Sequence, residues 1–404
     1  MSVRGLLLLL LLIPGQLLAS ENGVELLPGM DHVFLSPRLE WLEDPQGQMT
    51  LADIRKALAA GRFRSYPEDI PNFGYTHSAV WFHARIHNGS GQWRRWLLEI
   101  GYPLLDDIRV FIQYSDKPPR HFLGGDRRPF PSRYIENTHF LFPLELEPGE
   151  QAELFIRVRT GSAMLMPANL WAPERFHSLD HRRQFADGLY YGALLAMLLF
   201  NIVVYLFIRD RYYPLYLGFL AAFVLFQSTL EGYAYEYLWP NAPLWNDKAL
   251  SLFIPLALLF LLLFIRAFLQ LRTRAPGIDR IYRAGAWIMA GLLLLAPFLS
   301  YQSSIRIETL INFPIILLVL YTSLRLWLQG NRPAGIIFAS WLALLLGILL
   351  YLLQVYELLP VNALTLNALK FGALIQVLGF ATALLARVRQ LVVENRIMQE
   401  RRRK

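Results

Sequence analysis

Side chains that could bind a ligand gather in one strand-like segment in the first half of this 404-residue chain. Trp81, His83 and Arg85 alternate in the stretch WFHARIH, so they would lie on one face of a β-strand. An aromatic ring can cover the apolar face of a sugar, while Arg and His side chains hydrogen-bond its hydroxyls. The same spacing also fits a tryptophan buried in a core, and both interpretations stay open.

A surface loop carries the second candidate set. Residues 124–133 place charged side chains among glycines and prolines, where a rigid sheet would present them to a ligand. The alternative is a structural connection in which Arg133 pairs with Glu136 or another acidic neighbour. The candidate side chains are Asp126, Arg127, Arg128 and Arg133.

Catalytic and metal-binding chemistry is not predicted. The sequence contains no cysteine, which excludes thiol nucleophiles, disulfides and cysteine-ligated metals. His83 and His87 would share a strand face, but a metal needs further ligands that the sequence does not place beside them. No HExxH helix, GxSxG turn or P-loop occurs. We therefore expect no catalytic residues, no metal, no cofactor and no enzymatic activity.

The candidate ligand-binding residues all lie within residues 21–180. The sequence pattern of this segment predicts an antiparallel β-sandwich or jelly roll. Runs of β-branched and aromatic residues are separated by turn residues, as at 88–91 and 148–149. One helix is predicted at 51–60, with Thr50 as its N-cap. The predicted strands are 80–87, 93–100, 108–114, 138–146, 153–160 and 168–171.

The first twenty residues have the three regions of a secretory signal peptide. Arg4 precedes the apolar run 6–13, which is too short to span a bilayer, and the small residues Ala19 and Ser20 follow. We therefore predict a cleaved signal peptide at 1–20 and export of the domain behind it.

Seven apolar stretches fill residues 185–386. Each is long enough to cross, as a helix, a hydrocarbon core of roughly 30 Å. An odd number of spans places the two ends of the bundle on opposite sides of the membrane, and 55% hydrophobic residues fit this architecture. The predicted spans are 185–208, 213–230, 250–269, 284–300, 309–328, 333–355 and 365–386.

Arginines are concentrated in one set of connections between these stretches. Arg209 and Arg211 follow the first stretch and Arg272 and Arg274 follow the third, whereas the opposite loops carry acids such as Glu231. Because short cytoplasmic loops retain Lys and Arg, the exported domain is predicted outside and the C-terminus inside. Cytoplasmic loops beside anionic lipid also explain the net charge of +8, so no nucleic-acid partner is expected.

Several motifs resemble a known family. DGLYYGALLAMLLFN at 187–201 and EGYAYEYLWPNAPLW at 231–245 resemble the membrane core of the bacterial seven-transmembrane receptors with diverse intracellular signalling modules. The exported segment is similar to that family's second type of extracellular sensing domain. That similarity rests on WFHARIHN, on LEIGYPLLDDIRVFI from Leu98, on GGDRRPFPSR ending at Arg133, and on PGE at 148–150 and LWAP at 170–173.

The resemblance implies a jelly-roll sensor, related in shape to carbohydrate-binding modules, coupled through seven helices to a cytoplasmic output in a bacterial inner membrane. Family members usually continue into a catalytic signalling module, whereas only eighteen residues follow Ala386 here. We therefore expect a periplasmic small-molecule or glycan ligand and a separate cytoplasmic kinase or cyclase that reads the signal. A transporter or a membrane scaffold without signalling output is the alternative.

The tail at 387–404 suggests how a signal would leave. Five residues recur at spacings of four and three, so they would form one helical seam suited to a coiled-coil homodimer. The alternative is a basic, solvated helix end lying on membrane lipid. The seam residues are Leu384, Val388, Leu391, Asn395 and Met398.

Polar residues inside the predicted spans are the last candidates, because polar groups buried in a membrane are costly and often functional. Asn and Gln more often bridge neighbouring helices than bind ligand. Lys370 is the exception to follow, although it lies near the outer end of the last span and could snorkel to the interface. The set is Asn201, Gln227, Asn312, Gln354, Lys370 and Gln376.

Overall fold

The computed structural model describes residues 23–92, 94–115, 117–355, 358–359 and 363–403, and of residues 352, 355, 363, 366 and 387–403 it describes the backbone alone. The predicted signal peptide lies outside the described residues. The chain forms two compact units, and each is treated by itself below. The β unit comprises the residues up to Gly125 together with His139–Arg175. The helical unit comprises Asp126–Thr138 together with the residues from Phe176 onward.

The β unit is a sandwich of two sheets, which confirms the predicted fold. The larger sheet has the order β4-β3-β5-β10-β7-β8, with β1 added in parallel to β5, and the smaller sheet has the order β2-β11-β6-β9. All the other pairs are antiparallel. The strands are β1 (Gly23–Glu25), β2 (His32–Phe34), β3 (Glu40–Asp44), β4 (Arg64–Ser65), β5 (Ala79–His87), β6 (Arg94–Ile100), β7 (Asp107–Tyr114), β8 (Arg120–Gly124), β9 (Phe140–Leu146), β10 (Gln151–Arg159) and β11 (Ala168–Trp171).

The core of the sandwich lies between the two sheets. Successive side chains of a strand point to opposite faces, so Phe82 of β5 and Trp96 and Leu98 of β6 project inward together with apolar residues of the neighbouring strands. All three are almost completely buried. With no cysteine in the sequence, this apolar core must hold the domain together without disulfides.

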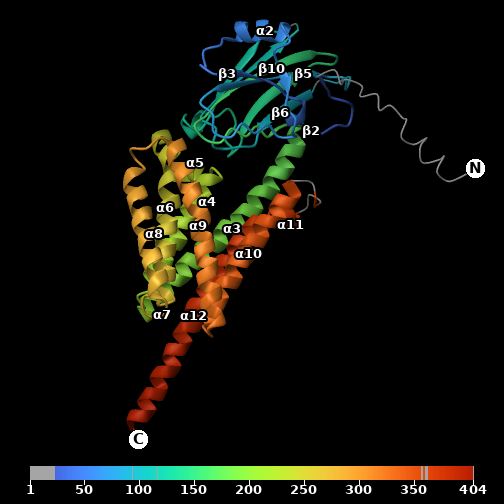
Figure 1. Ribbon diagram of the computed structural model, residues 1–404. Helices are drawn as coiled ribbons and strands as arrows, with labels where there is room; N and C mark the ends of the chain where they lie inside the picture. Colours follow the sequence, from blue (N-terminus) through green and yellow to red (C-terminus); the bar gives the residue numbers. More distant parts are fainter. Residues whose placement is uncertain (1–22, 93, 116, 356–357, 360–362, 404) are drawn as a thin grey trace, which may run out of the picture. The chain divides into compact units, whose positions relative to one another are not determined.

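The helix α2 (Leu51–Ala59) covers the other face of the larger sheet (Figure 1). Thr50 and Asp53 form a capping box, in which each side chain bonds the other residue's backbone N–H. The helix and its predicted N-cap are therefore confirmed. Ile54 and Ala57 pack against Trp81 and Phe155 of the sheet in a second apolar cluster.

The helical unit has a helix at each of the seven predicted spans. Six of them are long and apolar enough to cross a membrane among the described residues. The other helix, α8, carries Asp279, Arg280 and Arg283 in its first turns, and these charges shorten its apolar part. The helices are α3 (Pro173–Ile208), α4 (Tyr213–Leu230), α5 (Tyr233–Tyr237), α6 (Pro243–Phe268), α7 (Leu271–Arg274), α8 (Pro276–Leu295), α9 (Tyr301–Leu328), α10 (Arg332–Val355), α11 (Ala363–Leu366) and α12 (Ala368–Arg403).

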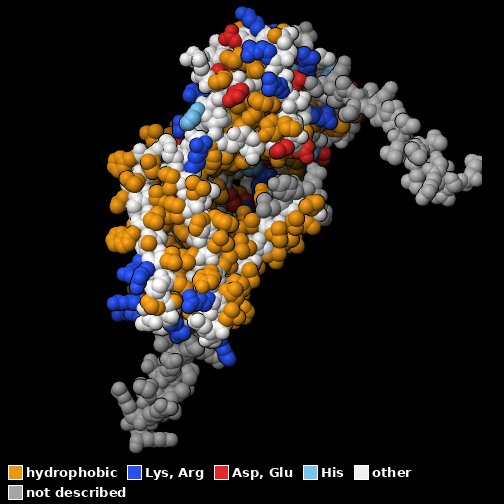
Figure 2. Space-filling model, in the orientation of Figure 1, with side chains coloured by type: hydrophobic (Ala, Val, Ile, Leu, Met, Phe, Trp, Pro, Cys, Tyr) orange, Lys and Arg blue, Asp and Glu red, His pale blue; other side chains and the backbone are white. Residues whose placement is uncertain are grey.

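Apolar side chains cover the visible face of the helical unit, and Lys and Arg gather at the end that contains α7 (Figure 2). Inside the bundle, aromatic rings of Tyr216, Phe264 and Phe380 bring α4, α6 and α12 together, with centroids 5.7 Å apart for both pairs that involve Phe264. Tyr216 also donates a hydrogen bond to the carbonyl of Val377 at 3.1 Å. These contacts tie α12 firmly to the rest of the bundle.

Small residues allow α10 and α12 to approach closely. A Cβ atom on Gly372 would lie 2.9 Å from the carbonyl oxygen of Ala343 and 3.1 Å from the Cα of Leu344. A Cβ on Gly347 would in turn overlap the backbone of Ala368. Such backbone-to-backbone packing is typical of membrane helices, where dispersion contacts replace the hydrophobic effect between helices.

Candidate functional site

The predicted aromatic platform lies under α2. Trp81 is 2% exposed and its ring stacks on Phe111 at a centroid distance of 5.7 Å. His83 is also buried, and its Nδ1 lies 3.3 Å from Glu40 Oε2. Burial lowers the pKa of His83, although the hydrogen bond to Glu40 acts in the opposite direction. Trp81 and His83 thus share a face, as expected, but that face is occupied by the protein's own helix.

Arg85 is the accessible member of this set. Its side chain is 64% exposed, and its Nε lies 3.4 Å from Glu153 Oε1 on the neighbouring strand. Farther across the same sheet, the rings of Phe111 and His121 stack at 4.5 Å. The register pairs Phe155 with Phe111 and Phe111 with His121, so an aromatic row continues beyond the part that α2 covers.

The second candidate set belongs to the helical unit. Residues 126–138 connect β8 to β9, yet they pack with the helices. The N–H of Phe130 donates to the carbonyl of Pro240 at 2.8 Å, and the hydroxyl of Tyr235 donates to the carbonyl of Arg128 at 2.5 Å. The loop is therefore docked by backbone as well as side-chain bonds.

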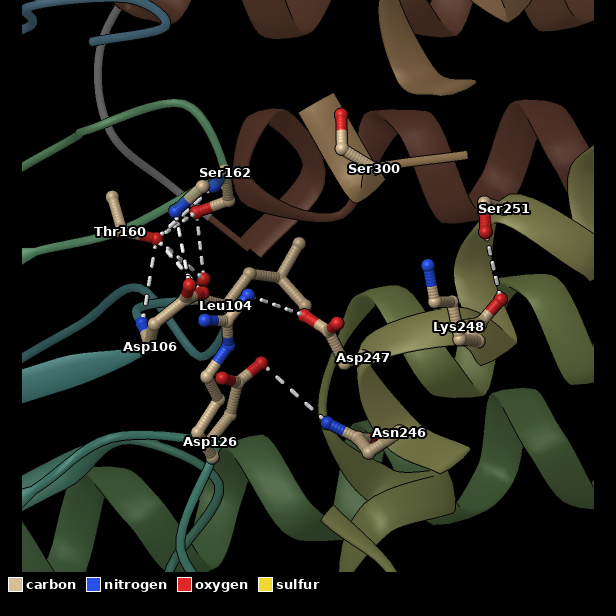
Figure 3. Close-up of polar contacts among 12 residues, drawn as sticks. Leu104, Asp106, Asp126, Thr160, Ser162, Asn246, Asp247, Lys248, Ser251 and Ser300 are labelled. Carbon is tan, nitrogen blue, oxygen red and sulfur yellow. Dashed lines mark hydrogen bonds and ion pairs between the residues drawn. The ribbon is translucent and has the colours of Figure 1, made fainter. Parts of the chain in front are cut away.

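Charged contacts reinforce this docking. Arg127 Nη2 lies 3.1 Å from Asp247 Oδ1. Asn246 Nδ2 lies 3.5 Å from Asp126 Oδ2, and a dashed line joins these two residues in Figure 3. Arg133 donates from Nη1 to the carbonyls of Asn137 and Thr138 at 2.6 and 2.9 Å.

The Arg133 guanidinium also lies 4.4 Å from the ring centroid of Phe130, and desolvation lowers its pKa to about 10. Arg133 therefore helps to shape the loop from within. A ligand-binding role for the four loop residues stays a prediction.

A cluster of charged and phenolic side chains joins α3, the C-terminal end of α4, α5 and α12 in the helical unit. Lys370 of α12 forms an ion pair with Asp187 of α3. Its Nζ also lies 3.1 Å from Oε2 of Glu231, the C-cap residue of α4. One ammonium group is thus shared by two carboxylates, and we call Lys370, Asp187 and Glu231 the ionic cluster.

Tyrosines complete the hydrogen bonding of the ionic cluster. Tyr233 of α5 donates to Asp187 Oδ2 at 2.6 Å, and Tyr191 of α3 donates to Glu231 Oε2 at 2.9 Å. The Lys370 ammonium also lies 5.9 Å from the ring centroid of Tyr190. Hydrogen bonds and a cation–π contact compensate the cost of removing the three charges from water.

Glu231 needs a positive neighbour. A carboxylate at the C-terminal end of a helix is repelled by the negative end of the helix dipole. Burial raises the pKa of Glu231, and the Lys370 ammonium counteracts that shift. Removing one partner from such a buried ion pair typically costs about 3–5 kcal/mol, because the remaining charge is left uncompensated.

The helix α3 depends on this cluster more than its neighbours do. Only 11% of its apolar window is buried, compared with 61% for α6 and 50% for the membrane part of α12. Apolar side chains such as Leu199 and Phe207 project outward. Fewer apolar contacts therefore hold α3 in the bundle than hold α6. The polar contacts of the ionic cluster then make a larger share of the contacts that hold α3.

The predicted seam in the tail is only partly described. Leu384 is buried in the core of the bundle, so a coiled coil would have to begin beyond it. The backbone of α12 continues as a helix to Arg403 (Figure 1). The side chains of Val388, Leu391, Asn395 and Met398 lie outside the described residues, so the seam stays a prediction.

Sequence reasoning singled out Lys370 but missed its partners. Asp187 and Glu231 open the two stretches that carry the family resemblance, which was the available signal. It also missed Glu308 of α9, which is 2% exposed. Its Oε2 and the hydroxyl of Ser304, one turn earlier, have no hydrogen-bond partner in the described part of the chain.

Comparison with known families agrees with this architecture. A family model described as 7TM diverse intracellular signalling matches residues 183–387, and a model described as 7TMR-DISM extracellular 2 matches residues 36–172. The chain belongs to the 7TMR-DISM family. The resemblance noted in the sequence is thereby confirmed in both regions and in their order. No curated protein matches the chain.

As a member of this family, the protein is a membrane receptor with an extracellular sensor domain. The ionic cluster lies wholly within the matched membrane region, since Asp187, Glu231 and Lys370 all fall between residues 183 and 387. The cluster therefore lies in the matched membrane region and outside the matched extracellular region.

Proposed function

We propose that this receptor senses a ligand on its exported β unit and passes the signal through seven helices to a separate cytoplasmic protein. The observation that carries the proposal is the continuity of α3. The strand β11 ends at Trp171, and α3 begins at Pro173 and continues for 36 residues. Because a single residue lies between the strand and the helix, we expect a movement of β11 on ligand binding to act on the first turn of α3.

The proposed ligand is a small molecule or glycan that binds the outer face of the larger sheet. The exposed side chain of Arg85 and the stacked rings of Phe111 and His121 support this choice, because sugars combine apolar faces with hydroxyl groups. Titrating the purified receptor and an Arg85→Ala variant with candidate glycans tests the site. Equal affinity for both proteins would remove Arg85 from it.

The proposed location is a bacterial inner membrane, with the β unit in the periplasm and the C-terminus in the cytoplasm. A reporter that works only in the cytoplasm is expected to be active when fused after Lys404 or at Pro276, and inactive at Ala242. The reason is the clustering of arginines such as Arg272 and Arg274 near one end of the bundle. Activity at Ala242 would reverse the orientation and contradict the receptor model.

The proposed output is a kinase or cyclase that reads the tail, either by docking on its basic residues or by pairing with its apolar seam. Replacing Leu391 with Lys should disrupt the seam, and deleting residues 401–404 should remove four positive charges. We expect at least one change to reduce downstream output in cells and the first to reduce cross-linked dimer. If both variants insert and signal like the parent, the tail is only a membrane anchor.

A further inference from the structure

We propose that the ionic cluster is a latch that holds the sensor-connected helix α3 to the output helix α12, and that signalling opens it. The inference rests on the proposed function, because it assigns a closed and an open state to the same relay. It adds the contact that is formed in the closed state and broken in the open state, which is the ion pair between Lys370 and Asp187.

The connectivity of the cluster fits this role. Asp187 belongs to the helix that begins one residue after the last sensor strand. Lys370 belongs to the helix that continues to Arg403. Although 183 positions separate them in the sequence, their charged groups are in direct contact. The first and last spans are thus joined directly by an ion pair, without an intervening helix.

Electrostatics make the contact suited to two states. With Lys370 in place, one positive charge neutralises part of two negative charges in a site with little water, where Coulomb attraction is strong. When Lys370 leaves, Asp187 and Glu231 face each other as like charges. The same groups therefore attract α3 in the closed state and repel it once the ammonium is withdrawn, which favours a sharp change over a gradual one.

The two helices differ in how easily they move. The membrane part of α12 is fixed by close backbone packing at Gly372 and by the hydrogen bond from Tyr216 to Val377. In contrast, the apolar window of α3 is 11% buried. Opening the latch should therefore displace α3 while α12 initially keeps its place in the bundle. The relay then follows when α12 repacks against the new position of α3.

Spin labels report this distance directly. The chain has no cysteine, so Leu199→Cys on α3 and Leu385→Cys on α12 give a pair of unique labelling sites, and both leucines are at least 43% exposed. In the purified full-length receptor we expect one narrow distance distribution. Adding Asp187→Asn or Lys370→Met should broaden it and shift its mean by roughly 5 Å, the size of a one-turn helix displacement.

Matched variants isolate the latch. Lys370→Arg retains a positive charge and should preserve the parental distribution. Lys248→Met removes another lysine of the helical unit, whose Nζ bonds only the Leu299 carbonyl at 2.5 Å among its described contacts, and should also leave the distribution unchanged. If the Lys370→Met receptor does not insert into the membrane, the Asp187→Asn receptor alone tests the latch. That variant should still insert, because Lys370 keeps its ion pair with Glu231.

The outcomes separate the latch from the proposed function. A parental distribution in an inserted Asp187→Asn receptor overturns the latch, whatever the ligand or the tail variants do. A shifted distribution supports the latch even without ligand or output protein. If that shift occurs while the tail variants signal like the parent, the latch stands and the proposed route of output is wrong.

Discussion

Replacing Trp81 with Ala is expected to lower the free energy of unfolding of the β unit by about 3–5 kcal/mol. The indole is 2% exposed, packs in the cluster with Ile54 and Ala57 of α2, and stacks on Phe111. Truncation would leave a cavity beneath α2 that the rigid sheet cannot fill. The loss applies without any ligand, because the contacts are internal to the protein.

Urea unfolding of the expressed domain 21–180, followed by far-UV circular dichroism, measures this effect. Arg85→Ala is the matched control, because Arg85 lies four residues after Trp81 on the same strand and its side chain is on the same face of the sheet. Its side chain is 64% exposed, so its free energy of unfolding should stay within about 0.5 kcal/mol of the parent's. If Trp81→Ala has the same free energy of unfolding as the parent, the burial of Trp81 under α2 is contradicted. Trp81 would then return to the set of candidate ligand contacts.

Replacing Gly372 with Leu should destabilise the helical unit. The new Cβ would lie 2.9 Å from the Ala343 carbonyl oxygen, so α10 and α12 would have to separate along their closest contact. Overpacking of this kind typically costs about 1–3 kcal/mol, which corresponds to a loss of roughly 2–12 °C in the midpoint of thermal unfolding. Leucine keeps the span apolar, so membrane insertion itself should be unaffected.

Thermal unfolding of the detergent-purified receptor, followed by size-exclusion chromatography after heating, provides the measurement. Gly192→Leu on α3 makes the same chemical change where no atom lies within 4 Å of a new Cβ, and it should leave the midpoint nearly unchanged. Equal midpoints for Gly372→Leu and the parent would show that α10 and α12 do not pack at these glycines.

The sequence by itself determined the architecture, six of the eleven strands that the structure describes, α2 and the helices at the seven predicted spans. Strand alternation, turn residues and the N-cap residue Thr50 are local signals, and they correctly predicted the sandwich and α2. Apolar length did the same for the membrane helices, because a span must satisfy its own backbone hydrogen bonds. The charges of α8 show where that signal weakens, since the helix forms although its first turns are polar.

Only the tertiary structure decided which side chains meet. Alternation puts Trp81 and Phe82 on opposite faces, but it does not say that Phe82 enters the sandwich core or that α2 covers Trp81. The docking of residues 126–138 among the helices is likewise absent from local patterns. Asp187 and Lys370 meet across 183 positions, because the fold of the helical unit brings the two side chains together and no periodicity in either helix encodes that contact.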